Sequence, residues 1–177
     1  MDRRVIILTE MAMALALALL LSHFRLFRAP YGGSVTLAMI PIVIIGLRWG
    51  TRAGIMVGVA LGFLRLMFDP YIVHWAQYVL DYPLAFGFLG LSGLRIHRPW
   101  VGITLGFAGR FASHVVTGIL FFAAFAPEGT PAALYSVLYN GTFLIPEWLI
   151  TVLIAPWLFR RLDDNLPVVM DRGNSRE

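Results

Sequence analysis

The amino-acid sequence predicts an all-α integral membrane protein, a compact bundle of six transmembrane helices. Of its 177 residues, 59% are hydrophobic and 14% are charged, and the mean hydropathy is +0.77. Soluble domains are much more polar than this. The apolar stretches continue almost to the C-terminus, whereas a secretory signal would be one short apolar stretch before a polar chain. We therefore expect no soluble domain.

Six stretches are apolar enough and long enough to be transmembrane helices. Such a helix needs roughly 20 mostly apolar residues, or a few fewer where neighbouring helices bury its ends. The predicted spans are Val5–Phe24, Val35–Leu47, Ala53–Phe68, Trp75–Leu94, Val101–Ala124 and Leu134–Phe159. Three connecting segments, FRAPYGGS, FDPYIVH and FAPEGTPA, combine proline and aromatic residues, two of them with glycine as well. This composition is typical of ordered turns, and we expect these segments to cap one end of the bundle.

Small residues at helical spacing predict which spans pack closely. Gly54, Gly58 and Gly62 recur at every fourth position of the third span, and Gly102 and Gly106 do so in the fifth. This spacing lets helix backbones approach each other in lipid, and it predicts a compact bundle.

The first span contains the alanine-rich stretch MAMALALALL. It places Ala12 beside Ala16, and Ala14 beside Ala18, on the surface of a helix. These alanines could serve ordinary packing within the bundle, or they could dock to another membrane subunit. The pattern by itself leaves both interpretations open.

An even number of spans places both ends of the chain on one side of the membrane, and the arginines indicate which side. The chain has 14 arginines and no lysine. Those between the spans gather on the side of the termini: Arg3, Arg4, Arg48, Arg52, Arg95, Arg98, Arg160 and Arg161, against Arg25 and Arg28 on the other side. The positive-inside rule then predicts that both termini are cytoplasmic. Residues 1–161 are expected to form the transmembrane domain, and residues 162–177 a polar cytoplasmic tail.

Several kinds of chemistry are disfavoured by motifs that the sequence lacks. It has no cysteine, and therefore no disulfide or thiolate site. It contains neither the His-Glu-x-x-His motif of metal sites nor the Gly-x-Ser-x-Gly motif of serine hydrolases. A Walker A loop for ATP requires a lysine. We therefore predict no metal and no cofactor, and active transport would need another subunit or an ion gradient.

Asp81 is the main acidic residue within the predicted spans, near the outer end of the fourth. A carboxylate in a membrane span costs about 3 kcal/mol on insertion scales, so it normally faces a cavity or a partner. One interpretation is an ion pair with Arg65 or Arg110, which also lie within spans. The other interpretation is a binding site in which Asp81 is the anion.

The fifth and sixth spans favour the binding site. His114, Gly118 and Phe122 are spaced four residues apart, so they share one face of a helix. Tyr135 and Asn140 lie at the outer start of the sixth span. A carboxylate, an imidazole, a carboxamide and aromatic rings together suit a small, flat, cationic, nitrogen-rich ligand. These residues predict ligand binding rather than catalysis.

Four blocks of sequence between Ala29 and Gly141 resemble one family of membrane proteins. They are GGSVTLAMIPI, RWGTRAGIMVGVALGFLRLMFDPYIVHWAQYVLDYPLAFGFLGLSG, GRFASHVVTGILFF and FAPEGTPAALYSVLYNG. In this order they resemble the thiamine-specific substrate-binding component, or S component, of energy-coupling factor (ECF) transporters. The resemblance implies a six-helix protein of the bacterial plasma membrane that has no enzymatic activity and captures thiamine from outside the cell.

The resemblance also implies protein partners. An S component delivers its vitamin by toppling in the bilayer while it is docked on a transmembrane coupling subunit, which carries two cytoplasmic ATPase subunits. In this family the coupling subunit contacts the alanine-rich face of the first helix, which matches Ala12, Ala14, Ala16 and Ala18. The resemblance therefore favours docking as the role of these alanines.

The thiamine contacts of the family correspond to nine residues of this chain: Asp81, Tyr82, His114, Gly118, Phe122, Tyr135, Asn140, Tyr71 and Tyr31. Asp81 stands where many relatives have glutamate, so the charge is kept on a shorter side chain. Phe122 stands where some relatives have tryptophan, so an aromatic face is kept with a weaker attraction for cations.

Three alternatives to a thiamine S component are left open by the sequence. One is an S component for another vitamin or for a thiamine precursor. Another is an independent secondary transporter, in which Asp81, His114 and Arg110 would relay protons. The third is a membrane enzyme with His114 as a general base, for which the nearest second carboxylate, Glu147, is expected to lie deeper in the sixth span.

Overall fold

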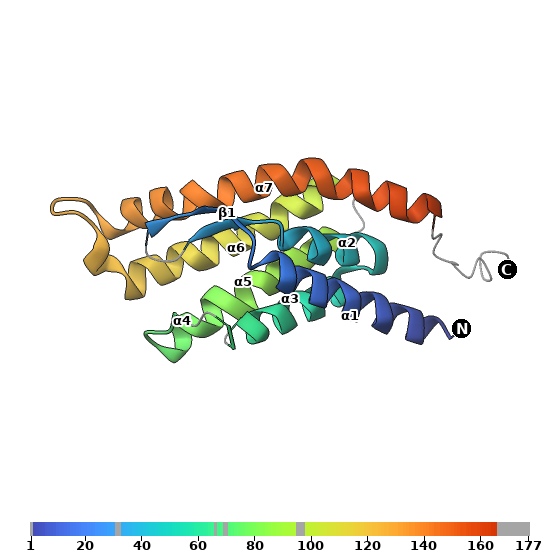
Figure 1. Ribbon diagram of the computed structural model, residues 1–177. Helices are drawn as coiled ribbons and strands as arrows, with labels where there is room; N and C mark the ends of the chain where they lie inside the picture. Colours follow the sequence, from blue (N-terminus) through green and yellow to red (C-terminus); the bar gives the residue numbers. More distant parts are fainter. Residues whose placement is uncertain (1, 31–32, 66, 69–70, 95–97, 166–177) are drawn as a thin grey trace, which may run out of the picture.

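The helices of the protein lie side by side along one long axis, with a small β-hairpin at the edge of the bundle (Figure 1). The structure is a computed structural model, and it describes residues 2–30, 33–65, 67–68, 71–94 and 98–165. Within this part of the chain, each of the six predicted spans corresponds to a helical segment. The predicted all-α membrane fold is therefore confirmed.

The structure places the ends of the helices as follows. The α-helices are α1 (Arg3–Leu21), α2 (Met39–Trp49), α3 (Thr51–Arg65), α4 (Trp75–Val79), α5 (Ala85–Phe88), α6 (Pro99–Phe121) and α7 (Ala132–Asn165). Helical turns of other types are η2 (Leu80–Leu84), η3 (Leu89–Gly93) and η4 (Ala123–Phe125). The predicted fourth span is thus one continuous segment, made of α4, η2, α5 and η3. Among the described helices, α1, α6 and α7 are long and apolar enough to cross a membrane by themselves.

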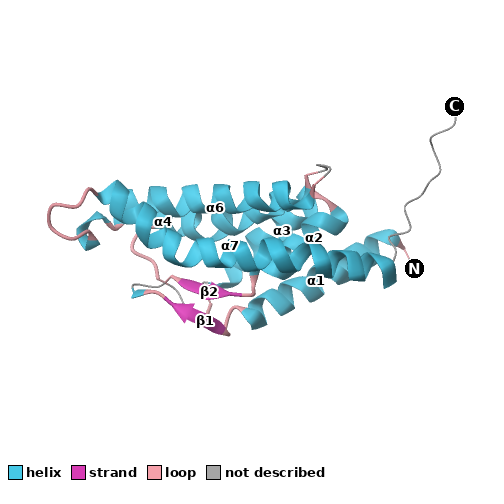
Figure 2. Cartoon of the chain, turned by 90° about the horizontal axis from the view of Figure 1, so that it is seen from above, coloured by secondary structure: helices cyan, strands magenta, loops and turns pink. Residues whose placement is uncertain are grey.

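The start of the predicted second span is a β-strand rather than a helix. Strands β1 (Arg25–Arg28) and β2 (Ser34–Thr36) pair in antiparallel orientation, and α2 begins only at Met39. Figure 2 shows this hairpin beside α1 and α7. Val35 was predicted to start a helix because it is apolar, but its β-branched side chain is equally suited to a buried strand. With 11 residues, α2 is about 16 Å long, and the hairpin adjoins its N-terminal end.

The fourth span contains a π-helical turn, η2, because of a proline. Pro83 lies inside this turn and cannot donate a backbone hydrogen bond. The N–H of Ala85 reaches back five residues to the carbonyl of Leu80, which also accepts a hydrogen bond from Ser113 Oγ at 2.7 Å. Such π-helical turns occur often at functional sites. Here the turn carries Asp81 and is bonded directly to α6.

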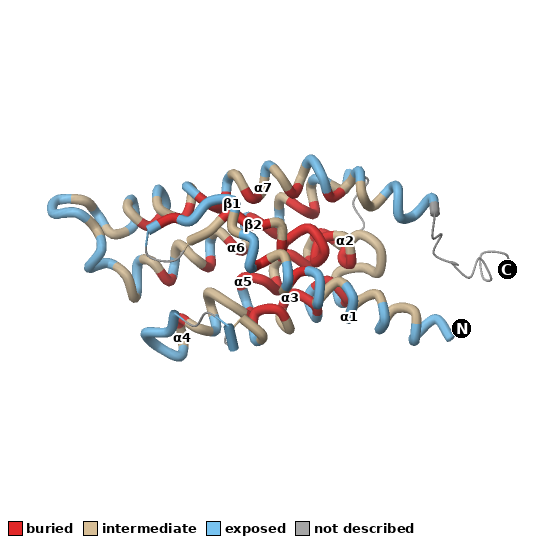
Figure 3. Tube along the Cα trace, in the orientation of Figure 1, coloured by how far each residue is buried: buried red, intermediate tan, exposed pale blue. Residues whose placement is uncertain are grey.

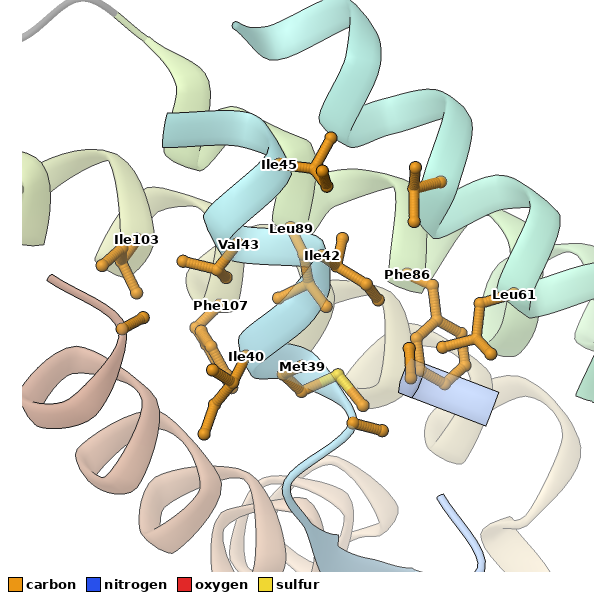
Figure 4. Close-up of a cluster of buried hydrophobic side chains, with 14 of the residues drawn as sticks. Met39, Ile40, Ile42, Val43, Ile45, Leu61, Phe86, Leu89, Ile103 and Phe107 are labelled. Atoms are coloured by element: carbon orange, nitrogen blue, oxygen red, sulfur yellow. The ribbon is translucent and has the colours of Figure 1, made fainter. Parts of the chain in front are cut away.

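The hydrophobic core surrounds α2 in the middle of the bundle. Figure 4 shows Ile42 and Val43 of α2 among side chains from the neighbouring helices, including Leu61, Leu89 and Phe107. The buried segments lie mainly in the centre of the molecule (Figure 3). The outward surface, by contrast, exposes many large apolar side chains, among them Leu8, Met13, Leu17, Leu153 and Trp157. An apolar outer surface is what lipid requires.

The glycines of α3 allow it to pack against the fourth span. A Cβ atom at Gly58 would lie 2.2 Å from the carbonyl oxygen of Phe86, and one at Gly62 would lie 2.6 Å from Pro83. On α6, a Cβ at Gly106 would lie 2.9 Å from the carbonyl oxygen of Phe88. No larger side chain fits at these distances, so the predicted close packing is confirmed.

The alanines of α1 do not form one exposed face. Ala18 is fully buried in the core, and Ala14 is partly buried against it, whereas Ala12 and Ala16 are exposed. Ala14 and Ala18 thus face the bundle, and Ala12 and Ala16 face away from it, because residues two positions apart lie on different sides of a helix. The docking of these alanines to another subunit stays a prediction; in this conformation Ala12 and Ala16 are accessible for it, and Ala18 is not.

The first residues of α1 and the last residues of α7 lie at the same end of the bundle (Figure 1). There, Arg48 donates two hydrogen bonds to Glu10, at 2.6 and 3.1 Å, and Trp49 donates a third at 2.7 Å. These contacts hold α1 against α2. The predicted tail begins within α7, which continues to Asn165, and residues 166–177 lie outside the described residues.

Candidate binding site

A cavity of about 160 Å³ lies at the end of the bundle opposite the termini, among η2, α6, α7 and β2. A water molecule needs roughly 10 to 15 Å³ of such volume, so the cavity has room for an organic ligand. Eight of the nine predicted thiamine contacts line it: Asp81, Tyr82, His114, Gly118, Phe122, Tyr135, Asn140 and Tyr71. Tyr31 lies outside the described residues. The structure thus brings together side chains from four separate parts of the sequence.

Asp81 is the centre of a hydrogen-bond network in this cavity. Its Oδ1 atom accepts a hydrogen bond from Thr117 Oγ1 and lies 2.9 Å from His114 Nδ1. Its Oδ2 atom accepts a bond from Gln77 Nε2 at 2.8 Å. Three side chains from α4 and α6 therefore hold the carboxylate in one orientation, and none of these three is an arginine.

His114 is oriented by Asp81. A carboxylate only accepts hydrogen bonds, so the Nδ1 atom that faces Asp81 carries a proton, and with that tautomer Nε2 is an acceptor whenever the ring carries no second proton. Within the described part of the chain, this Nε2 atom is buried and has no hydrogen-bond partner. A buried acceptor without a partner is costly. A ligand with a donor group would satisfy it.

Arg110 pairs with Glu147 rather than with Asp81. Its NH1 atom donates to Glu147 Oε2 at 2.7 Å, and both side chains are buried, with 7% and 1% of their surfaces exposed. Glu147 Oε1 also accepts bonds from the backbone N–H and the hydroxyl of Thr36, both at 3.0 Å. The guanidinium of Arg110 lies over the ring of Phe86, 4.8 Å from its centre. This network joins α6, α7 and the hairpin, and it leaves the charge of Asp81 to other partners.

Arg110 therefore does not support two of the alternatives that the sequence left open. A proton relay through Asp81, His114 and Arg110 would need these groups in one chain of hydrogen bonds, but Arg110 donates its hydrogen bond to Glu147. The enzyme alternative considered Glu147 as a second carboxylate for His114, but Glu147 is engaged by Arg110 and Thr36. The carboxylate that contacts His114 is that of Asp81. Arg65, the other arginine considered for Asp81, also lines the cavity.

Aromatic rings form the outer rim of the cavity. The ring of Tyr71 stacks on that of Phe122 with 5.8 Å between centres and an angle of 27°. The neighbouring Phe121 stacks instead on His74, at 5.1 Å, and is not among the lining residues. Of the two consecutive phenylalanines, Phe122 faces the site, as the helical spacing from His114 predicted.

Gly118 allows α6 and α7 to meet beside the cavity. A Cβ atom there would lie 2.0 Å from Ser136 Oγ, which donates a hydrogen bond to the carbonyl of Val115. Asn140 Nδ2 donates to the carbonyls of Ser136 and His114, at 2.9 and 3.3 Å. The amide nitrogen of Asn140 is thus committed to the protein, and the carboxamide oxygen is the part left for a ligand.

The wall on the hairpin side is also aromatic. Tyr135 and Tyr139 stack at 5.9 Å, and Tyr139 meets the ring of Phe143 edge to face. The hydroxyl of Tyr139 donates to the carbonyl of Pro30 and accepts from the N–H of Gly33 at 3.1 Å. Phe143 in turn contacts His114 edge to face at 6.1 Å. These rings join the hairpin to α7 and to the imidazole.

Sequence reasoning missed several residues of the site, and helical spacing could have identified two of them. Gln77 lies four residues before Asp81, and Thr117 lies three after His114, so each shares a helix face with a predicted residue. Phe143 carries no such signal, because its contact with His114 depends on how α6 and α7 are placed.

Comparisons with known proteins agree with this architecture. The model of a family described as "Thiamine transporter protein (Thia_YuaJ)" matches residues 8–166. The chain is 34% identical to the thiamine transporter ThiT of Bacillus subtilis, over 89% of this chain and 92% of the relative. It is 24% identical to ThiT of Lacticaseibacillus paracasei, over the same fractions. The solved structure of ThiT from Listeria monocytogenes superimposes with a TM-score of 0.81 and 30% identity, covering 92% of this chain and 98% of that one.

Proposed function

Because this chain belongs to the thiamine transporter protein family, we propose that it is a thiamine-binding S component and that the cavity around Asp81 and His114 is its thiamine site. It is a multi-pass protein of the bacterial plasma membrane, and its function is transport rather than catalysis. The chemistry of the cavity supports the assignment of the site and suggests how each group contributes.

The observation that carries the proposal is the pair formed by Asp81 and His114. Asp81 supplies a negative charge, and His114 presents a buried acceptor, Nε2, that has no protein partner in the described part of the chain. Thiamine offers the complement of both, since its thiazolium ring is permanently cationic and its aminopyrimidine ring bears an amino donor. A ligand that satisfies both groups gains two interactions that are strong in a dry site.

The roles of the other lining residues follow from their positions. Phe122 and Tyr71 offer aromatic faces at the rim, where a flat cationic ring gains from stacking and from cation–π attraction. Tyr135 and the carboxamide oxygen of Asn140 lie on α7, opposite His114, where they would contact the polar edge of the pyrimidine. Asp81 already accepts three bonds, so its charge acts on the ligand at short range while His114 makes the direct contact.

The direction of capture follows if both termini are cytoplasmic. The cavity lies at the opposite end of the bundle from the termini, so it would then open toward the outside of the cell. The arginine distribution supports this orientation. The exposed alanines Ala12 and Ala16 lie on α1, where the family resemblance implies docking to the coupling subunit, with two ATPase subunits on the cytoplasmic side.

Thiamine binding can be measured directly. Purified protein in detergent would be titrated with thiamine while the fluorescence of its five tryptophans is recorded. Asp81→Asn is expected to weaken binding by well over tenfold, since it removes the negative charge beside the cationic ligand and the charge-assisted bond that orients His114, and such a bond is worth roughly 1.5 to 3 kcal/mol. Asp164→Asn, an exposed carboxylate at the far end of α7, is the control and should bind like the wild type.

Competition experiments distinguish thiamine from related ligands. The pyrimidine precursor, thiamine phosphates and other vitamins would each be added to protein that has bound thiamine. Displacement by one of them at a lower concentration than thiamine itself would reassign the substrate. Absence of saturable binding by folded wild-type protein would refute the proposal.

A further inference from the structure

Gln77 is a buried polar residue of the cavity that is not among the nine residues matched to thiamine contacts, and its bonds reach beyond Asp81. Its side chain is 1% exposed and makes three hydrogen bonds. Nε2 donates to Asp81 Oδ2 at 2.8 Å and to the carbonyl of Tyr71 at 3.2 Å, and Oε1 accepts from the N–H of Val73 at 3.3 Å.

These contacts determine the orientation of the amide. Two acceptors, a carboxylate and a carbonyl, face Nε2, and one donor faces Oε1. If the amide were turned over, its oxygen would face both acceptors and its nitrogen would face an N–H, so all three bonds would be lost. Gln77 is thus fully satisfied in one orientation, and a residue that lacks either group could not replace it.

The partners of Gln77 belong to two different parts of the site. One is Asp81, whose other oxygen is already engaged by His114 and Thr117. The other is the backbone of residues 71–73, which precedes α4. This backbone is also held by Tyr82, whose hydroxyl accepts from the N–H of Tyr71 at 3.4 Å. Gln77 therefore joins the carboxylate directly to the segment that carries Tyr71.

That segment borders the cavity through Tyr71. The ring of Tyr71 stacks on that of Phe122, and both residues line the cavity. Tyr71 is itself 44% exposed. Its backbone carbonyl accepts a hydrogen bond from Gln77, and its N–H donates one to the hydroxyl of Tyr82, so both residues help to hold Tyr71 beside the cavity.

We propose that Gln77 is a positioning residue of the binding site: it holds the Asp81 carboxylate toward α6 and ties the Tyr71–Val73 segment over the bound ligand. This inference rests on the proposed thiamine site and deepens it. Loss of Gln77 removes both effects at once, so thiamine binds more weakly and leaves faster. Dissociation is affected more than association, because the tied segment covers a ligand that has already entered.

Two variants test this role. Gln77→Met fills a similar volume and makes none of the three bonds. Gln77→Glu keeps the acceptor for Val73 but places a second carboxyl group beside Asp81. When that new group is protonated, it can donate to Asp81, whereas two carboxylates at this distance repel each other. Thiamine affinity and dissociation rate would be measured for both variants and the wild type from pH 6 to pH 8.5.

Gln77→Met is expected to weaken thiamine binding by about tenfold or more at every pH, mostly through faster dissociation, since a hydrogen bond to a charged group is lost. Gln77→Glu is expected to bind progressively more weakly than the wild type as the pH rises. Asp81 is bonded to Gln77, and other titratable or charged residues line the same cavity: Arg65, Tyr71, Tyr82, Arg110, His114, Tyr135, Tyr139 and Glu147. The readout is therefore the difference from the wild-type profile, which contains their contributions.

The outcomes separate this inference from the proposed function. If the wild type fails to bind thiamine, the proposed function fails, whatever the variants do. If the wild type binds and both variants match its affinity and dissociation rate, Gln77 has no positioning role. If Gln77→Met binds like the wild type, Gln77 acts only by filling space, which overturns the inference. If both variants bind weakly but Gln77→Glu shows no pH dependence beyond the wild type, the contact with Asp81 does not position the site, which also overturns it. Thermal melting of each variant reports whether it is folded.

Discussion

The Nδ1 atom of His114 lies 2.9 Å from the Oδ1 atom of Asp81, so two side chains 33 positions apart in the chain form one hydrogen-bonded pair across two helices. The pair assigns different tasks to the two residues. Asp81 supplies charge and determines which imidazole nitrogen carries the proton, and the other nitrogen of His114, Nε2, is buried without a hydrogen-bond partner among the described residues. In the proposed site, this carboxylate–imidazole arrangement serves to recognise the ligand.

His114→Asn tests the role of the Nε2 atom separately from the hydrogen bond between His114 and Asp81. The asparagine Nδ2 occupies nearly the position of the histidine Nδ1, so the bond to Asp81 is kept while Nε2 is lost. Thiamine affinity should fall by about tenfold, because a hydrogen bond in a buried site is removed, and the melting temperature should change little. His114→Ala removes both nitrogens and should lower both quantities. Equal affinities of His114→Asn and the wild type would show that Nε2 does not contact the ligand.

Phe122→Ala should weaken thiamine binding more than Phe121→Ala does. Phe122 lines the cavity, whereas Phe121 stacks on His74 away from it, so the two neighbours form a matched pair. An aromatic contact with a cation is worth about 0.5 to 2 kcal/mol, which corresponds to a loss of up to roughly thirtyfold for Phe122. Tryptophan fluorescence titration measures both variants. Equal losses would mean that neither ring stacks on the ligand.

Gly118→Ala should lower thermal stability and thiamine affinity together. Its Cβ would lie 2.0 Å from Ser136 Oγ, so α6 and α7 would have to separate beside the cavity. Gly141→Ala is the control, because there the nearest atom, Ile145 Cδ1, is 3.5 Å away, an ordinary contact. That substitution should be neutral or slightly stabilising, as alanine favours helices. Thermal melting with and without thiamine checks both expectations, and a Gly118→Ala protein as stable as Gly141→Ala would contradict the packing argument.

Glu147→Leu should destabilise the protein even though it does not touch Asp81. It leaves Arg110 as a buried, unpaired cation and removes the acceptor of the Thr36 N–H. Breaking one side of a buried pair costs about 3 kcal/mol or more, whereas replacing both partners with apolar residues is often tolerated. The double variant Arg110→Met with Glu147→Leu should therefore melt above the single variant. A double variant no more stable than Glu147→Leu would argue against the ion pair as the cause.

Ala16→Trp should impair ATP-driven thiamine uptake while thiamine binding stays intact. Ala16 is exposed on α1, at the surface that we propose for docking to a coupling subunit, and a large side chain there prevents close approach of another helix. Ala112→Trp, at an exposed position of α6, is the control and should support uptake. Uptake would be measured in proteoliposomes with the coupling module. Normal uptake by Ala16→Trp would place the docking surface elsewhere.

The architecture could largely be predicted from the order of residues. Apolar stretches identify six spans because lipid requires apolar surfaces and satisfied backbones, and this demand acts on each segment separately. The glycines of the third and fifth spans predicted close packing for a similar reason, since small size is a property of the residue itself. The prediction failed at Val35, where a short strand and a helix start look alike in the sequence.

The binding site, like the fold, was predictable only in part from the sequence. The sequence by itself determined which chemical groups are available: one carboxylate, one imidazole, one carboxamide and several rings at helical spacing, all within blocks that resemble one family. Only the tertiary structure decided which of them meet. Arg110 pairs with Glu147 and leaves Asp81 to Gln77, Thr117 and His114, and Ala18 turns inward while Ala16 turns outward. Residue type and periodicity act along one helix, whereas hydrogen-bond partners depend on how helices are placed relative to each other, within a few tenths of an ångström.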